Sequence, residues 1–170
     1  QADPATAQVN RFFTAEFYRL AAERLAPRGG LSFRMGAAEN YIGPMLARQL
    51  ATQEATLRSA FAQAEIVPGA TAVFLASRGL LTIDPDRLAD ELERREAAVP
   101  SFNRELLRAR LHPLRRERLR TSLDGAAAGL NSDDRPIAFF FHARLWSGQK
   151  RGLDAALLGR LEPLPPAVPL

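Results

Sequence analysis

Few polar side chains in this sequence stand at a position where a ligand could bind. Glu39, Asn40 and Tyr41 form a polar triplet in a loop that follows the apolar run 31–35. Ligands in open α/β sheets bind beyond the carboxyl ends of strands, so this triplet is a candidate binding site. The alternative is structural: Asn40 forms a turn, and Tyr41 packs as a lid over its neighbours.

Cysteine and histidine offer little further chemistry. The chain has no cysteine, which excludes disulfide bonds and thiolate metal ligands. His112 and His142 are far apart in the sequence, and no carboxylates surround them at the spacing of a metal-binding set. The sequence therefore predicts no metal site.

The net charge leaves room for an anionic partner but does not require one. The chain has 23 lysine and arginine residues, almost all of them arginine, against 19 acidic residues, for a net charge of +4. The strongest basic cluster consists of six arginines: Arg108, Arg110, Arg115, Arg116, Arg118 and Arg120. No aromatic residues alternate with them and Glu117 interrupts them, which favours a solvated helix face and argues against a nucleic-acid partner.

The elements that must position the polar triplet follow from local signals. Thr14 is a good N-cap, and Pro27 with Gly29-Gly30 ends the helix predicted from Thr14 to Leu25. Its predicted apolar stripe is Phe17, Leu20, Ala21 and Leu25. A strand is predicted over Leu31–Met35. A second helix begins at Pro44 and runs to about Ala62, with Leu46, Leu50, Leu57 and Phe61 on one face.

Two short strands follow, Glu65–Val67 and Ala72–Ala76, and the Pro68-Gly69 turn between them predicts an antiparallel hairpin. The rest is mainly helical. Asp84-Pro85 opens one helix, another covers Leu106–Leu111, and a third runs from Pro113 to Gly125 with Leu114, Leu119 and Leu123 inward. Residues 131–135 are predicted to be a polar turn, and Ile137–Trp146 fits a strand or a helix.

These elements predict an α/β fold with a helical extension. We expect three parts: an α/β unit over 1–78, helices over 79–146, and a basic, proline-rich, poorly ordered tail over 147–170. No strand or glycine-rich loop precedes the first helix, so we expect the second half of a larger fold. The first strand would then have an unpaired edge, which predicts a homodimer covering that edge or rearranged helix packing. No run of about 18 apolar residues and no signal peptide is present.

The order helix, Leu-x-Pro-x-Gly-Gly, strand, helix, strand and hairpin resembles the C-terminal half of the Rossmann-like class I methyltransferase fold. Asp3-Pro4 and the later Phe13-Thr14-Ala15-Glu16-Phe17-Tyr18 resemble the Asp-Pro … Phe-Thr-x-Glu-Phe-Tyr stretch of the spermidine synthase-like (aminopropyltransferase) family. Val67-Pro68-Gly69 and Phe74-Leu75-Ala76-Ser77 resemble its terminal hairpin. Bacterial versions fused to transmembrane segments are similar to this chain over Thr6–Thr14, Glu39–Tyr41 and Asn131–Trp146. The resemblance is firm over 3–77 and looser over 78–146.

The resemblance implies a transferase that uses decarboxylated S-adenosylmethionine or S-adenosylmethionine. The family binds this donor through a glycine-rich loop and an acidic ribose-binding residue, and its catalytic base is the first Asp of an Asp-x-x-Asp-Pro element. Asp3-Pro4 matches the end of that element, so the base would precede Gln1. We therefore expect no catalytic residue and no cofactor site in residues 1–170, which alone would be inactive.

The same resemblance implies that Asp3 helps to hold a cationic amine, whereas a turn or helix cap is the structural interpretation that we favour. Met35 stands about where polyamine-making members carry a glutamine that contacts the substrate. Ile66 or Val67 stands where they carry a tyrosine that faces the amine. These departures argue against polyamine synthesis, even by the parent protein.

Two functions from different classes remain open. The first is the C-terminal part of a spermidine synthase-like transferase, with Asp3, Glu39, Asn40 and Tyr41 as candidate substrate-binding residues. The resemblance places this protein at the inner membrane, with this part on the cytoplasmic side. The second is a non-catalytic binding or scaffolding module of a membrane protein. Its helices would contact neighbouring membrane segments, with Ile137–Trp146, Arg144, Lys150 and Arg151 near the membrane face.

Overall fold

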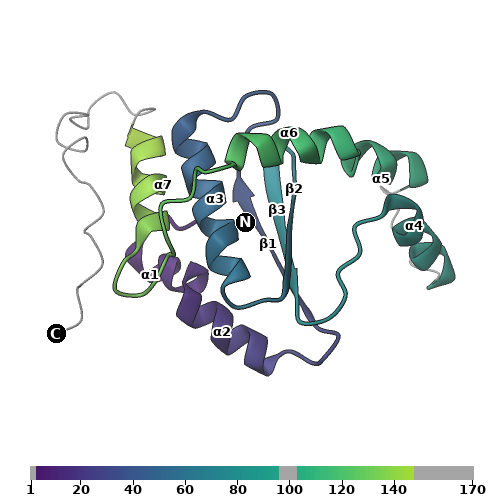
Figure 1. Cartoon of the computed structure of the whole chain (residues 1–170), viewed down its shortest axis with the longest axis horizontal. Coiled ribbons are helices and arrows are strands. Elements are labelled where there is room, and N and C mark those ends of the chain that lie inside the picture. Colours follow the sequence, from purple (N-terminus) through teal and green to yellow (C-terminus); the bar gives the residue numbers. More distant parts are fainter. Residues whose placement is uncertain (1–2, 96–102, 148–170) are drawn as a thin grey trace.

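The computed structural model describes residues 3–95 and 103–147, which form a mixed α/β structure (Figure 1). The elements in chain order are α1 (Ala7–Asn10), the 3-10 turn η1 (Arg11–Phe13), α2 (Ala15–Arg24), β1 (Gly30–Gly36), α3 (Pro44–Arg58), β2 (Gln63–Val67), β3 (Thr71–Ser77), α4 (Pro85–Arg94), α5 (Arg104–Arg110), α6 (Pro113–Leu123) and α7 (Ile137–Ser147). The tail predicted over 147–170 lies outside the described residues, apart from Ser147 at the end of α7.

The strands of the described part form one sheet in the order β1-β3-β2, and β3 is antiparallel to both of its neighbours. β1 and β2 therefore run in the same direction on either side of β3. Phe74 of β3 lies opposite Phe33 of β1 and opposite Ile66 of β2. The hairpin predicted around Pro68-Gly69 is confirmed.

One face of the sheet carries the main hydrophobic core. Side chains alternate across a strand, so every second residue of the three strands points to this face. Its buried members are Met35, Ala64, Ile66, Ala72, Phe74 and Ala76. α3 packs against them through Leu50 and Leu57, as its apolar spacing predicts, but it ends at Arg58, short of the predicted Ala62.

α2 forms where the capping signals predict it, and the Thr14 hydroxyl accepts a hydrogen bond from the Phe17 backbone N–H at 3.4 Å. The predicted buried stripe is wrong in part, because Leu20 is 52% exposed while Tyr18 is fully buried. α2 packs between β1 and α3, and the Tyr18 hydroxyl accepts a hydrogen bond from Gln53 Nε2 at 2.6 Å. Contacts with α3 therefore determine which face of α2 is buried. The apolar pattern of α2 alone does not predict this face.

α4 and α5 pair at one end of the molecule, away from α3 (Figure 1). The Asp84 carboxylate caps α4 by accepting from the Arg87 backbone N–H at 2.8 Å, as the Asp-Pro signal predicts. The pair has a small core of its own around Ala89, Leu107 and Leu111. This end of the structure is joined to the sheet mainly through Val67 of β2.

α6 contacts α3, and its Arg115 bonds to Glu39 in the connection between β1 and α3. Leu119 and Leu123 are buried in the main core as predicted, whereas Leu114 is 62% exposed, contrary to its predicted inward position. Leu114 lies in the first turn of α6, beyond the part of the helix that packs against the core.

The ambiguous run Ile137–Trp146 is a helix, α7, packed beside α3 (Figure 1). Ile137, Ala138 and Phe141 are buried. The predicted polar turn before α7 does not account for Asn131, whose side chain is fully buried because it bonds three groups of the fold. Within the described ranges, 3–95 and 103–147, no helix is long and apolar enough to cross a bilayer.

Candidate functional site

The carboxyl end of β1 is joined to the N-terminal segment through Asp3. Asp3 Oδ1 accepts a hydrogen bond from the Gly36 backbone N–H at 2.9 Å. The Asp3 carbonyl also accepts from the Ala5 N–H at 2.6 Å, which forms the local turn expected of an Asp-Pro pair. Asp3 is half-buried, so its carboxylate is both a structural tie and a charge at the end of a strand.

His142 of α7 belongs to the same region. Burial lowers the pKa of the His142 imidazole, while the Asp3 carboxylate acts in the opposite direction by favouring the imidazolium. The sequence carries no signal of this link, because 139 positions separate Asp3 from His142.

The loop that carries the polar triplet contacts α6. The Glu39 carboxylate accepts a hydrogen bond from Arg115 at 2.7 Å, and this ion pair joins the loop after β1 to α6. The Arg115 guanidinium lowers the pKa of Glu39, first through the hydrogen bond and then through its charge. Arg115 thus already neutralises the carboxylate that sequence analysis placed in a binding site.

A groove of about 340 Å³ opens between the triplet loop and α6. We call it the α6 groove; its lining residues are Glu39, Asn40, Ile42, Pro68, Arg115, Arg118, Leu119 and Ser122. Asn40 is exposed at this groove, whereas Tyr41 is 75% exposed and does not line it. The structure therefore brings Glu39 and Asn40 together with α6 and leaves Tyr41 apart, so that the packed-lid interpretation of Tyr41 is wrong.

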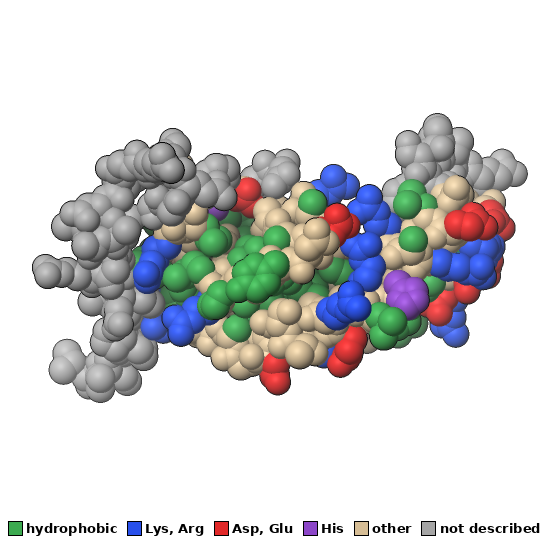
Figure 2. All heavy atoms as spheres, turned by 90° about the horizontal axis from the view of Figure 1, so that it is seen from above, with side chains coloured by type: hydrophobic (Ala, Val, Ile, Leu, Met, Phe, Trp, Pro, Cys, Tyr) green, Lys and Arg blue, Asp and Glu red, His purple; other side chains and the backbone are tan. Residues whose placement is uncertain are grey.

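Half of the arginine cluster over α5 and α6 pairs with acidic side chains: Arg108, Arg115 and Arg120. Arg108 pairs with Asp86 at 2.8 Å, and Arg120 pairs with Glu117 at 3.4 Å. Figure 2 looks down on the side where α6 lies in Figure 1 and shows arginine side chains gathered around acidic groups. This mixture of charges agrees with the predicted solvated helix face. It also leaves Arg118 without an acidic partner among the described residues.

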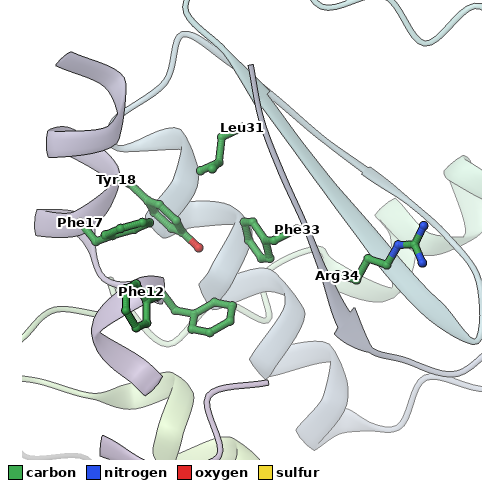
Figure 3. Close-up of a pocket in the computed structure, with 7 residues that line it drawn as sticks. Phe12, Phe17, Tyr18, Leu31, Phe33 and Arg34 are labelled. Atoms are coloured by element: carbon green, nitrogen blue, oxygen red, sulfur yellow. The ribbon is translucent and has the colours of Figure 1, made fainter. Parts of the chain in front are cut away.

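A second hollow, which we call the β1-edge pocket, lies between α2 and β1 (Figure 3). Its volume is about 430 Å³, and it is lined by Phe12, Phe13, Phe17, Tyr18, Leu31, Phe33 and Arg34. Figure 3 shows the aromatic rings facing one another, while Arg34 points to the opposite side of β1. In the described part of the chain β1 pairs with β3 alone, so its other edge is unpaired beside this pocket.

The positions that depart from polyamine-making relatives are apolar in the structure. Met35 is fully buried, Ile66 is 6% exposed, and Val67 packs against the α4–α5 pair. These side chains belong to the hydrophobic cores and offer no polar contact to an amine. Within residues 3–95 and 103–147, no three His, Cys, Asp or Glu side chains are grouped as metal ligands would be.

Comparison of the sequence with protein-family models and with curated proteins finds no match.

Proposed function

We propose that this chain is the C-terminal part of the catalytic domain of a spermidine synthase-like transferase. The reaction would move an aminopropyl or alkyl group from a sulfonium donor derived from S-adenosylmethionine to an acceptor amine. The donor-binding loop and the catalytic carboxylate would come from sequence upstream of residue 1, as the resemblance implies.

The observation that carries the proposal is the place of β3. In a simple hairpin at a sheet edge, the second strand pairs only with the first. Here β3, the second strand of the hairpin, pairs with β2 and also, along its whole length, with β1. The result is an antiparallel strand between two strands that run in parallel. This is the arrangement expected of the terminal hairpin in the class I methyltransferase fold, and it supports that fold over an unrelated α/β arrangement.

The proposed role of Asp3 follows from its place at the carboxyl end of β1, where open α/β sheets bind ligands. Its Oδ1 accepts from Gly36, and a carboxylate retains further lone pairs for an ammonium group. In the reaction the amine nitrogen forms a bond to the carbon beside the sulfonium sulfur. The carbon–sulfur bond breaks, a neutral thioether leaves, and the upstream base takes the amine proton. Asp3 would orient the amine and would not itself take the proton.

The experiment uses the protein encoded by the complete gene. Its upstream sequence is expected to contain a glycine-rich loop and an acidic residue about 20 positions later. Thioether release from each sulfonium donor, with a panel of amines, is then measured by mass spectrometry. We expect Asp3→Asn to lower kcat/KM by about tenfold to a hundredfold, because a hydrogen bond to a charged group contributes about 1.5 to 3 kcal/mol.

Asp133→Asn is the matched control, because Asp133 is exposed and its carboxylate makes no ion pair in the described structure. It should leave kcat/KM unchanged. An upstream sequence without the loop and the acidic residue, or a purified full-length protein that binds neither donor, would contradict the transferase proposal.

A second candidate, a binding or scaffolding module, is favoured by the α4–α5 pair. This pair has its own small core and extends from the sheet, as a docking arm would (Figure 1). Its exposed faces carry ion-pair networks, including Arg104 with Asp90 at 2.7 Å. If the full-length protein binds no donor, and Glu105→Arg with Ala109→Arg on the exposed face of α5 removes association with its membrane segments while the protein stays folded, this function replaces the first.

A further inference from the structure

The α6 groove concentrates positive charge on one side. Arg115 and Arg118 are three positions apart on α6, so they share a helix face, and both line the groove. Arg110 of α5 is near enough to lower the pKa of Glu39 through its charge. Arg115 bonds to Glu39, Arg110 acts on Glu39 through its charge, and Arg118 lines the same groove without an acidic partner within the described residues.

Glu39 acts as an internal stand-in for an anionic ligand. Its carboxylate bonds to Arg115 at 2.7 Å, which shows that the guanidinium can present a donor to an anion in the groove. The pair is open to solvent, since the side chains of Arg115 and Glu39 are 34% and 48% exposed. Exposed ion pairs of this kind contribute only about 0 to 1 kcal/mol, so an external anion with more charge can displace Glu39.

We propose that the α6 groove binds a small phosphate monoester, with Arg115 and Arg118 holding the phosphate and Ile42, Pro68 and Leu119 contacting its organic part. A phosphate monoester carries a charge of about −1.5 to −2 at neutral pH and has three acceptor oxygens, which suits two guanidinium forks better than one carboxylate does. The groove volume of about 340 Å³ lies within the range of small-ligand pockets. This inference does not depend on the proposed transferase activity.

The phosphate could also come from a nucleic acid, but the arrangement favours a small molecule. Arg108 and Arg120, which would extend a basic track along α5 and α6, have acidic side chains beside them, Asp86 and Glu117, and these carboxylates repel a polyanion. Arg115 and Arg118 share the groove with the apolar side chains of Ile42, Pro68 and Leu119, which the organic part of a phosphate monoester can contact. A nucleic-acid backbone needs a longer basic surface than this.

The test titrates residues 1–170 with phenyl phosphate, inorganic phosphate, benzoate and a short DNA duplex, by calorimetry in low salt. Phenyl phosphate should bind most tightly, because it combines the dianion with an apolar body. Arg118→Ala should weaken it about tenfold or more, the effect of one charge-assisted hydrogen bond. Glu39→Gln should tighten it severalfold, because the competing carboxylate is gone. Arg87→Ala, an exposed arginine of α4 away from the groove, is the matched control and should change nothing.

The outcome with Glu39→Gln separates the proposal from a loss of folding, since a damaged protein would bind less and not more. Weaker or unchanged binding in Glu39→Gln would overturn the proposal. Equal weakening by Arg87→Ala and Arg118→Ala would also overturn it, because it indicates attraction by net charge alone. DNA binding that is tighter than that of phenyl phosphate, and equally sensitive to Arg108→Ala and Arg118→Ala, would assign the surface to nucleic acid instead.

Discussion

Replacing Asn131 with alanine tests whether one buried amide holds α7 and the N-terminal segment together. Asn131 Nδ2 donates to the Phe13 carbonyl at 2.8 Å and to Asn10 Oδ1 at 3.2 Å. Asn131 Oδ1 accepts from the Ala138 backbone N–H at 3.0 Å. Ala138 is in the first turn of α7, where the backbone N–H groups have no partner within the helix. The side chain therefore caps α7 and ties it to the residues before α2.

The cost of Asn131→Ala follows from what each partner retains. The Phe13 carbonyl still accepts from Gln53 Nε2 at 3.0 Å, and Asn10 Oδ1 still accepts from the Phe139 N–H at 3.2 Å. The Ala138 N–H loses its partner and stays buried. Three lost hydrogen bonds at about 0.5 to 1.5 kcal/mol each, one of which leaves a buried donor unsatisfied, give about 3 to 4 kcal/mol. This is a large share of the roughly 5 to 15 kcal/mol that stabilises a domain.

Urea unfolding followed by circular dichroism measures this change in the free energy of unfolding. Asn40→Ala is the control, because Asn40 is exposed and its side chain makes no hydrogen bond in the described structure, so its effect should stay within about 0.5 kcal/mol. A cost below about 1 kcal/mol for Asn131→Ala would refute the reasoning, because the amide would then contribute no more than one exposed hydrogen bond.

Two further predictions concern ionisation and assembly. Burial raises the pKa of Tyr18 well above its usual range, so the folded protein keeps this phenol protonated while the unfolded chain loses the proton near pH 10. Stability should therefore fall as the pH rises above about 10, and phenolate absorbance of Tyr18 should appear only together with the loss of helical circular dichroism; earlier ionisation would show that it is not buried. The unpaired β1 edge should give a dimer whose formation depends on concentration in sedimentation experiments. Phe12→Asp, at a ring that is 61% exposed, should weaken this dimer at least tenfold, and a monomer at all concentrations would contradict the prediction.

Much of the secondary structure could be predicted because its signals are local. Thr14 caps α2 with its own hydroxyl, and Asp84 caps α4 with its own carboxylate. Pro44 occupies the start of α3, where a missing N–H costs nothing. The Pro68-Gly69 turn joins strands that are adjacent in sequence. In each case the residue that carries the signal acts within a few positions of itself.

The features that the sequence does not predict correctly depend on partners that are far away along the chain. Leu20 was expected inside, but the Tyr18 hydroxyl bonds to Gln53, so α2 turns Leu20 outward. In the sequence Asn131 has the features of an exposed loop residue. In the fold its side chain is buried and donates to the carbonyl of Phe13, which is 118 positions away. The α6 groove was missed for the same reason, because the Glu39–Arg115 pair joins residues 76 positions apart. An unpaired arginine within a charged helix has no sequence signal that separates it from its neighbours.

The two charged regions at the end of β1 have opposite preferences, which makes the two proposals separable. The Asp3 region, on the α7 side, presents a carboxylate and suits a cation. The α6 groove presents Arg115 and Arg118 and suits an anion, and Arg115 already neutralises Glu39. A cationic amine is thus favoured at Asp3 and disfavoured at the triplet. For an acceptor amine that carries a phosphate and contacts both regions, Asp3→Asn and Arg118→Ala would each raise the KM. An acceptor without an anionic group should respond to Asp3→Asn alone.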